Sequence, residues 1–491
     1  MLGHWRKHEE YQRFVIKQLG HYAEFEPELL LEYAVQIEKL WICNLDQLKC
    51  ILGSCYSSTG RRAEHQPEMF RAFILFTDLK IPISQWAGKL RDNSILRVIC
   101  GFPKGETPST ASFYDFMARI AGPCVAPRVK KFIRRPNKKI GKNKKMPPKH
   151  PGVTAKIASR IAAGRRFRDS AATRLNAIFS VAVLRSQEIG LLRPGLAVSG
   201  DGTCVKTGAS SHGKKVCGCK DRGIYDCKCP RKFSDPSASW GWDSHNECYF
   251  YGYTGYFLST YDSVHKLDLP LYLRVVDARR HDSVSALVAL SEFRDLYPSL
   301  EASAFISDSA SDNYATYELL ERWGMAAVIA LGKSNDGKRK YPGPASYDDK
   351  GRPICPAGHP MVYDSFYSKD RCRVKWRCPR ARGLVAESAE CASCSPSPYG
   401  RVVYTKPEWD PRIFCRIPRG TPQWRKLMKE RTACERVNNR VLHDYGVELG
   451  KYRGKNRIAF FVMVAAFNVH LDAQLKVMRM EGAPGLFSLA A

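Results

Sequence analysis

A run of strand-like and helix-like segments between about residues 195 and 332 constrains the fold of this chain more than any other feature. Three strand-like segments come first, and strands then alternate with amphipathic helices in the order β-β-β-α-β-α-β. A sheet built in this order has its faces covered by helices, so the pattern predicts an α/β domain with a mixed sheet. The segments are LAVSGDGT, ECYFYGYTGYFLSTY, LDLPLYLRVVDA, SVSALVALSEFRDLY, ASAFISD, YATYELLERWG and MAAVIAL.

The sequence on either side of this domain has a different character. The N-terminal part carries apolar residues at helical spacing, and Ser109 is a plausible N-cap for its last helix. A DNA-binding helix-turn-helix and a plain helical bundle both fit this pattern. The predicted order is an all-helical, DNA-binding domain (1–126), a basic arm or linker (127–175), the first part of the α/β domain (176–332), a Cys-rich insertion that could form a zinc ribbon (333–420) and C-terminal helices (421–491).

The charge of the chain points to a polyanionic partner. Its 78 Lys+Arg against 48 Asp+Glu give a formal net charge of +30, which suits DNA, RNA or an anionic membrane surface. The stretch from Pro127 to His150 has eleven basic residues and no acid. A solvated spacer does not need this one-sided charge, so we favour an arm that binds phosphate. The residues predicted to bind DNA there are Lys130, Lys131, Arg134, Arg135, Lys138 and Lys139.

Membrane association is not expected from the sequence. The most apolar helix-like run, Ile458 to Ala473, contains Asn468, His470 and Asp472 and is too short to span a bilayer, so it predicts a core helix. The N-terminus is charged and lacks the apolar segment of a signal peptide. We therefore expect a reducing cytoplasm, where the 18 cysteines bind metal more readily than they form disulfides.

Three separated acids are the candidates for catalysis. Asp201 is predicted on the first and central strand, Asp308 at the end of the fourth strand, and Glu435 on a helix. If these carboxylates converge, they could hold two divalent cations for an in-line attack on a phosphodiester. Each acid alone also has a structural explanation, as a turn aspartate, an N-cap or a surface glutamate.

Neighbouring residues complicate this assignment. Asp277 is the strongest rival, whereas Asp282 and Asp312 are interpreted as helix N-terminal acids. Arg431 precedes Glu435 by one helical turn, so it could either clamp a phosphate or form an ordinary helical ion pair.

Two groups of cysteines have spacings compatible with structural zinc. The first forms two C-x-C pairs, which are tighter than the usual C-x2-C, and the second lies in the insertion and includes one C-x2-C. Free thiols are the alternative in both places. Zinc would stabilise segments that are too short and polar to form their own core. The candidate ligands are Cys217, Cys219, Cys227 and Cys229 in the first group, and Cys355, His359, Cys378, Cys391 and Cys394 in the second.

Taken together, these stretches resemble the DDE transposases of bacterial insertion sequences, of the type with a glutamate signature on the last catalytic helix. Arg431 and Glu435 match the tyrosine, arginine, glutamate and lysine signature, whereas Met428 and Leu442 occupy the tyrosine and lysine positions. The resemblance covers roughly residues 195–460. It is carried by SGDGT, KFSDPSASWGWDS, YFYGYT, LRVVDARRHDSVSALVAL, ISDSASDNYATYELL, YGRVVYTKP and ERTACERVNN.

The resemblance implies an RNase H-like catalytic domain in which Asp201, Asp308 and Glu435 bind two Mg²⁺ ions, or Mn²⁺ in their place. It implies cleavage of double-stranded DNA at transposon ends, followed by attack of the freed 3′-hydroxyl on target DNA. We expect a homodimer on paired ends, associated with the bacterial nucleoid. The alternatives are a nuclease of the same fold without strand transfer, a non-catalytic DNA-binding descendant of a transposase, and an RNA-binding zinc protein.

Aromatic residues follow the first predicted strand. Trp240, Trp242 and Tyr249 interleave with polar residues, so they could stack on an unpaired base. We favour packing against the sheet.

Overall fold

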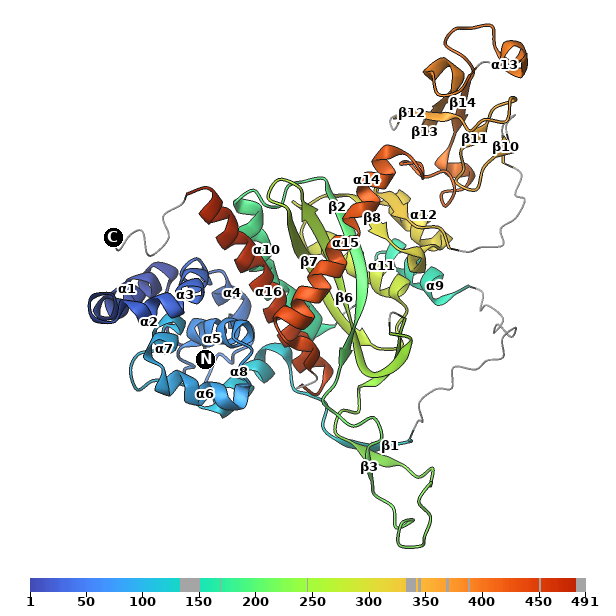
Figure 1. Cartoon of the computed structure of the whole chain (residues 1–491). Helices are drawn as coiled ribbons and strands as arrows, with labels where there is room; N and C mark the ends of the chain where they lie inside the picture. Colours follow the sequence, from blue (N-terminus) through green and yellow to red (C-terminus); the bar gives the residue numbers. More distant parts are fainter. Residues whose placement is uncertain are drawn as a thin grey trace.

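The structure is a computed structural model in which a helical N-terminal region leads into a mixed sheet covered by helices, with a small β-rich segment projecting from one end (Figure 1). The predictions of a mixed α/β chain and a helical N-terminus are confirmed. The described residues are 1–132, 151–167, 169–244, 246–332, 341–342, 346–367, 371–386, 389–449 and 452–482.

The N-terminal helices enclose an aromatic core. Ser109 accepts a hydrogen bond from the Ser112 amide (3.2 Å), which confirms the predicted N-cap. Helix α7 ends at Cys100 and is followed by Gly101, whose φ of +98° suits a residue without a side chain. The helices are α1 (His8–Phe25), α2 (Pro27–Glu32), α3 (Ala34–Trp41), α4 (Leu48–Gly53), α5 (Gln66–Asp78), α6 (Ile83–Asp92), α7 (Ser94–Cys100) and α8 (Thr110–Ala121).

Strand β2 (Leu196–Lys206) lies in the middle of the main sheet, as predicted. It pairs in parallel with β8 (Ala302–Ser307), which in turn pairs in parallel with β9 (Ala326–Ile329). On its other side, β2 pairs antiparallel with the long strand β6 (Cys248–Asp262). The far edge of β6 is shared by β5 (Ser239–Asp243) and then β7 (Leu267–Asp277).

Helices cover this sheet. The basic segment after residue 151 forms two helices, because Gly164 adopts a φ of +76° and Asp169 caps the second helix through the Ala172 amide (3.2 Å). The segment that carries Glu435 is likewise divided into two helices at Arg431. The helices are α9 (Val153–Ala162), α10 (Ser170–Glu188), α11 (Asp282–Leu296), α12 (Tyr314–Arg322), α14 (Pro422–Glu430), α15 (Thr432–Asn439) and α16 (Lys455–Met480).

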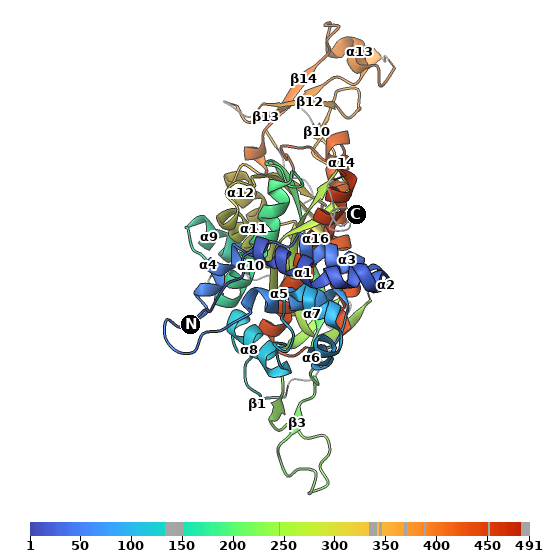
Figure 2. The same cartoon turned by 90° about the vertical axis from the view of Figure 1, so that its left-hand side faces the viewer.

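Helix α16 is the core helix that the sequence predicts. It is long and apolar enough to cross a membrane, but 94% of its most apolar 18-residue stretch is buried inside the molecule. It packs against α10 and β7 on one side and against α5 and α8 on the other (Figures 1 and 2). One helix therefore contributes to the cores of both the N-terminal region and the sheet domain.

A histidine in the middle of α16 gives the fold a pH-dependent component. His470 is fully buried, and its Nε2 lies 2.6 Å from the Pro270 carbonyl, which can only accept a hydrogen bond. Nε2 therefore carries the proton, and Nδ1 accepts from the Ser186 hydroxyl (2.8 Å). Burial lowers the pKa of His470 to about 4, which keeps the ring neutral at pH 7.

We expect acidification to destabilise the fold through this residue. Because the folded-state pKa is lower than the ordinary 6.5, the unfolded chain takes up the proton first. The stability from the neutral ring is complete above pH 6.5 and declines as the pH falls toward 4, by roughly 3 kcal/mol over the whole window. The apparent melting temperature should fall less between pH 7 and pH 5 in His470→Gln than in the wild type. An equal fall in both proteins would contradict the assignment.

The insertion forms a small β-rich unit around its own core of Val374, Trp376 and Val403. Two arginines in the segment between β14 and α14 attach the insertion to the main domain. Arg412 forms an ion pair with Asp312 (2.8 Å), and Arg416 forms one with Glu321 (2.6 Å). Its elements are β10 (Ser346–Tyr347), β11 (Pro353–Ile354), β12 (Val362–Tyr367), β13 (Arg373–Arg377), α13 (Ala389–Cys394) and β14 (Val402–Thr405).

The ion pair of Asp312 corrects its interpretation as a helix N-terminal acid. Asn313, not Asp312, caps α12, by accepting from the Thr316 amide (3.0 Å). Burial alone would raise the pKa of Asp312, but the hydrogen bonds from Arg412 and the Gly332 amide hold it below the ordinary value. This carboxylate therefore stays ionised and fastens the insertion.

The start of the predicted basic arm is part of a small sheet. Strand β1 (Arg128–Lys130) pairs with β4 (Arg231–Phe233), which also pairs with β3 (Lys214–Lys215). A long loop extends from this sheet, at the bottom of Figure 1. The arm thus begins as ordered structure.

Candidate functional site

Asp201 lies on β2, beneath helix α15. Its Oδ2 accepts a hydrogen bond from Asn438 Nδ2 on that helix (3.2 Å). Burial raises the pKa of Asp201 to about 7, and the nearby Asp282 carboxylate adds to this effect. The carboxylate is therefore held where its negative charge is incompletely compensated.

Asp308 follows β8 directly, beside Asp201. The register pairs Ser199 with Ile306, and two residues further along each parallel strand stand Asp201 and Asp308. Asp308 also accepts a hydrogen bond from the Ala310 amide (3.0 Å) at the start of the short helix η1 (Ser309–Ser311). It thus has the N-cap role that the sequence left open, together with a position next to Asp201.

Glu435 approaches from α15, which packs on β2, β6 and β7. Its carboxylate is half exposed and forms an ion pair with Arg431 Nη2 (2.6 Å). The ion pair that the four-residue spacing of Arg431 and Glu435 allowed is therefore present in the structure.

The three predicted acids line one open hollow with a volume of about 1180 Å³. We call it the acidic hollow and define it by Asp201, Asp282, Asp308, Glu435, Arg431 and Asn438. Its acids do not converge tightly. Across the described part of the chain, only a group of cysteines brings three or more potential ligand atoms all within 4.8 Å of one another.

Two members of the acidic hollow were not predicted as site residues. Asp282 does begin helix α11, as expected, but its carboxylate also lies over β2, where a methyl group added at Gly202 would be 2.5 Å from its Oδ1. Burial raises the pKa of Asp282, and Asp308 contributes in the same direction. Asn438 stands three residues after Glu435 on α15 and so shares its helix face. The sequence signal for Asp282 was Gly202, whose missing side chain leaves room for that carboxylate over β2.

Asp277, the predicted rival, is paired elsewhere. Its carboxylate binds Arg279 Nη2 (2.8 Å) and the Ser239 hydroxyl (2.6 Å). Although burial opposes ionisation, these hydrogen bonds lower the pKa of Asp277 to about 2. It does not line the acidic hollow.

Aromatic rings form one wall of the hollow. Trp242 packs edge-on against Tyr249 with ring centroids 4.9 Å apart, and Trp240 packs in the same way against Tyr251 at 5.4 Å. These pairs lie between the paired strands β5 and β6 on the surface of the sheet, and none of Trp240, Trp242 and Tyr249 is buried in the core. Trp242 is 37% exposed, so its ring also faces the opening.

The first cysteine group forms a compact four-sulfur cluster in the loop between β3 and β4. Cys217 Sγ lies 3.6 Å from Cys227 Sγ, and Cys219 Sγ lies 3.5 Å from Cys229 Sγ. All four thiols are free, and their sulfurs lie within 4.8 Å of one another. Zn–S bonds of about 2.3 Å in a tetrahedron put sulfurs about 3.8 Å apart. The group could hold a metal ion such as zinc.

Two hydrogen-bond donors stabilise negative charge on sulfur in this cluster, whereas hydrogen bonds to Cys219 and Cys217 raise the pKa of Cys229 to about 12. The backbone amide of Cys219 lowers the pKa of Cys217 to about 7. Arg222 Nη2 also lies 3.5 Å from Cys219 Sγ. Both donors stabilise negative charge on sulfur.

The second cysteine group does not assemble, which corrects the prediction of a zinc site there. Cys355 and His359 share one turn, in which the Cys355 amide donates to the His359 carbonyl (2.9 Å). Cys355 packs into the apolar core of the insertion. Cys378 follows β13, whereas Cys391 and Cys394 lie on α13, and the donor atoms of these described residues do not gather within 4.8 Å.

The predicted DNA-binding residues have different fates. Arg431 lines the acidic hollow. Lys130 is committed to local structure, since its Nζ donates to the Pro236 carbonyl (2.7 Å) and lies over the Phe233 ring (4.8 Å). Lys131 is exposed. The other four, Arg134, Arg135, Lys138 and Lys139, lie outside the described residues.

The two departures from the glutamate-helix signature have packing roles. Met428 packs against the apolar cluster that contains Ile306 and Val328. Leu442 is buried in the main core, in the π-helical turn Arg440–Asp444 that follows α15. Neither side chain offers a polar group toward the acidic hollow.

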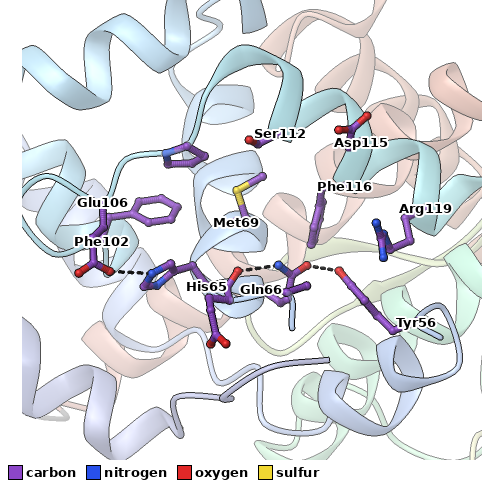
Figure 3. Close-up of a pocket in the computed structure, with 13 residues that line it drawn as sticks. Tyr56, His65, Gln66, Met69, Phe102, Glu106, Ser112, Asp115, Phe116 and Arg119 are labelled. Carbon is purple, nitrogen blue, oxygen red and sulfur yellow. Dashed lines mark hydrogen bonds and ion pairs between the residues drawn. The ribbon is translucent and has the colours of Figure 1, made fainter. Parts of the chain in front are cut away.

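A second hollow of about 310 Å³ lies among the N-terminal helices (Figure 3). His65 Nε2 binds Glu106 there (2.8 Å), and Gln66 is hydrogen-bonded to Tyr56. No residue predicted for function lines it. The acidic hollow is therefore the stronger candidate.

Comparison with protein-family models and with curated protein sequences finds no significant match for this chain.

Proposed function

We propose that this protein is a DNA transposase that uses two divalent cations to cleave and join DNA strands. The observation that carries the proposal is that Asp201, Asp308 and Glu435 line one hollow, from a central strand, the end of its parallel neighbour and a helix. Hard cations such as Mg²⁺ prefer carboxylate oxygens. The residues available in the hollow suit such ions.

The topology of the sheet supports assignment to the RNase H-like fold. Five of its six strands run in the order β7-β6-β2-β8-β9, with β2 antiparallel to β6 and parallel to β8, and β5 pairs with β6 on the same side as β7. In chain order, β2, β6 and β7 pair antiparallel to one another. Strands β8 and β9 each follow a helix and then pair in parallel on the other side of β2. Asp201 on the central strand and Asp308, directly after the neighbouring strand, then lie side by side.

The residues of the hollow have distinct roles in the proposed reaction. Bound divalent cations would activate the attacking oxygen and neutralise charge on the leaving oxygen. Asp201 and Asp308 supply the central ligands, and the Asn438 amide orients Asp201. Arg431 exchanges Glu435 for a DNA phosphate, which it can bind through two parallel hydrogen bonds. Glu435 is then released to act as a ligand.

The remaining parts of the proposal concern partners and cofactors. The formal net charge of +30 suits double-stranded DNA, including the transposon ends and the target. Joining two ends calls for two active sites, and hence a homodimer on DNA in the bacterial nucleoid. We assign a structural zinc ion to the Cys217, Cys219, Cys227 and Cys229 cluster.

A nuclease of the same fold that cuts without joining is the second candidate. The apolar packing of Met428 and Leu442 favours it, because polar residues at these signature positions would offer additional contacts to DNA.

A strand-joining assay separates the two functions. The full chain is incubated with Mg²⁺, supercoiled plasmid and pre-cut duplexes that end in a 3′-hydroxyl. Transposition predicts covalent insertion of these duplexes into the plasmid. Nicking without insertion would favour the nuclease, and the absence of both products across a library of end sequences would reject the proposed chemistry.

A further inference from the structure

We propose that the four-cysteine loop and the small sheet that carries it form a surface for the DNA backbone, organised by the metal that the cysteines bind. We call it the lysine surface and define it by Lys214, Lys220, Lys228 and Lys232. The choice of DNA as the polyanion rests on the proposed function. The inference gives the cysteine cluster a role in substrate binding beyond the stability of its loop.

One face of the small sheet presents lysines without acidic partners. Lys232 on β4 lies directly opposite Lys214 on β3 and Val129 on β1, and all three side chains are exposed. Like charges directly opposite each other in a sheet are destabilising. Within the described residues, neither lysine forms an ion pair. An anion bound over both ammonium groups would relieve their repulsion.

The basic side chains of the other face already have partners. Arg231 is buried, donates to the His212 carbonyl (3.2 Å) and lies over the Phe132 ring (3.9 Å). Lys130 donates to the Pro236 carbonyl (2.7 Å). The small sheet thus uses the cations of one face for its own packing and leaves those of the other face for a partner.

The cysteine cluster fixes the two lysines of the loop. Lys220 follows Cys219, and Lys228 stands between Cys227 and Cys229. The Sγ atoms of Cys219 and Cys229 are 3.5 Å apart, so the two segments that carry these exposed lysines lie together. Residues 214–232 contain seven basic residues and two acids. This segment stays positive even after the two negative formal charges of a tetrathiolate zinc centre are added, which suits phosphate.

The lysine surface is held in a fixed position next to the acidic hollow. Two connectors join the small sheet to β2 and to β5, and Asp235 in one accepts a hydrogen bond from the Thr207 hydroxyl in the other (2.7 Å). Asp235 is 2% exposed and also accepts from the Tyr253 hydroxyl (2.7 Å). At the far ends of these connectors, Lys206 and Trp240 line the acidic hollow. A duplex bound in the hollow would therefore meet the lysine surface.

The first test measures binding of a short labelled DNA duplex by fluorescence anisotropy, at several salt concentrations and without Mg²⁺. The zinc-loaded full chain is compared with two double variants, Lys214→Gln with Lys232→Gln and Lys220→Gln with Lys228→Gln. Each should bind about tenfold more weakly. Each should also lower the slope of log affinity against log salt by about 2, because two phosphate contacts are lost.

A matched control removes the same charge elsewhere. Lys17 on α1 and Lys476 near the C-terminal end of α16 are exposed, and these parts of the fold lie away from the small sheet (Figure 1). Lys17→Gln with Lys476→Gln should keep the wild-type affinity and salt slope. Circular dichroism would show that all three double variants are folded.

The second test separates organisation of the surface from its charge. Removing zinc converts thiolates mainly into neutral thiols, so the formal charge of the loop rises by up to about two. Charge alone then predicts tighter DNA binding by the zinc-free chain. We expect binding at least about tenfold weaker instead, because Lys220 and Lys228 lose their fixed positions. Adding zinc back should restore the affinity.

The outcomes separate this inference from the proposed function. Wild-type affinity and salt slope in both double variants of the lysine surface would overturn the inference. Equal or tighter DNA binding by the zinc-free chain would overturn the role of the metal. Weaker binding of these variants to duplex RNA or anionic vesicles, with DNA binding intact, would overturn the choice of partner. The expected salt slopes in a chain that does not cleave DNA in Mg²⁺ would support the lysine surface and reject the proposed function.

Discussion

Replacing Asp201 by asparagine is expected to reduce Mg²⁺-dependent DNA cleavage by on the order of 10³-fold or more, without unfolding the protein. Asparagine has nearly the same shape, and its oxygen can still accept the hydrogen bond from Asn438 Nδ2. It cannot supply the negative charge that a bridging cation ligand provides. Cleavage and strand joining should therefore fall together, because the proposed mechanism assigns both steps to one centre.

The measurement is single-turnover cleavage of a labelled DNA duplex at saturating protein. Asp295→Asn is the control, since Asp295 is exposed and pairs with Arg166 at the surface (3.0 Å). It should retain wild-type activity. Cleavage by Asp201→Asn at the wild-type rate would leave the acidic hollow without a catalytic role.

Loss of the four-cysteine cluster is expected to have the second largest effect, confined to the loop between β3 and β4. This loop has almost no apolar core, so a bound metal would provide most of its stability. The purified wild-type chain should contain about one zinc ion per molecule. Cys219→Ser should contain little zinc, and proteases should cleave its loop rapidly.

Metal analysis and limited proteolysis would measure these two effects. Cys248→Ser is a suitable control, because Cys248 is exposed and lies outside the cluster. Equal zinc content in the wild type and in Cys219→Ser would contradict the assignment. The acidic hollow belongs to other elements, so Mn²⁺ binding there should survive the loss of zinc.

Much of the fold could be predicted because local pattern and tertiary structure agree in the sheet domain. Strands β8 and β9 are short apolar runs, β2 begins with one, and α16 is apolar enough to be a core helix. The sharing of the β6 edge by β5 and β7 could not be predicted, since it depends on which residues pair at long range. The break at Gly164 depended on a single positive φ.

The site was predictable only in part, for a related reason. Asp201 and Asp308 could be placed because one lies within a predictable strand and the other comes directly after one. Asp282 looked like a common helix-starting acid, and only the fold reveals that it lies over Gly202. The second cysteine group had suitable spacing, but Cys355 contributes to an apolar core instead. Spacing along a chain does not determine which side chains meet.

The position of α16 has a consequence for synthesis of the protein. Phe73 and Phe76 pack against Phe460 and Phe461, which are synthesised several hundred residues later. Their hydrophobic surface stays uncovered until α16 has been synthesised. Nascent chains therefore need protection during this interval, and prematurely terminated ones are natural substrates for chaperones and proteases. A cell would accumulate the N-terminal helices only in chains that include α16.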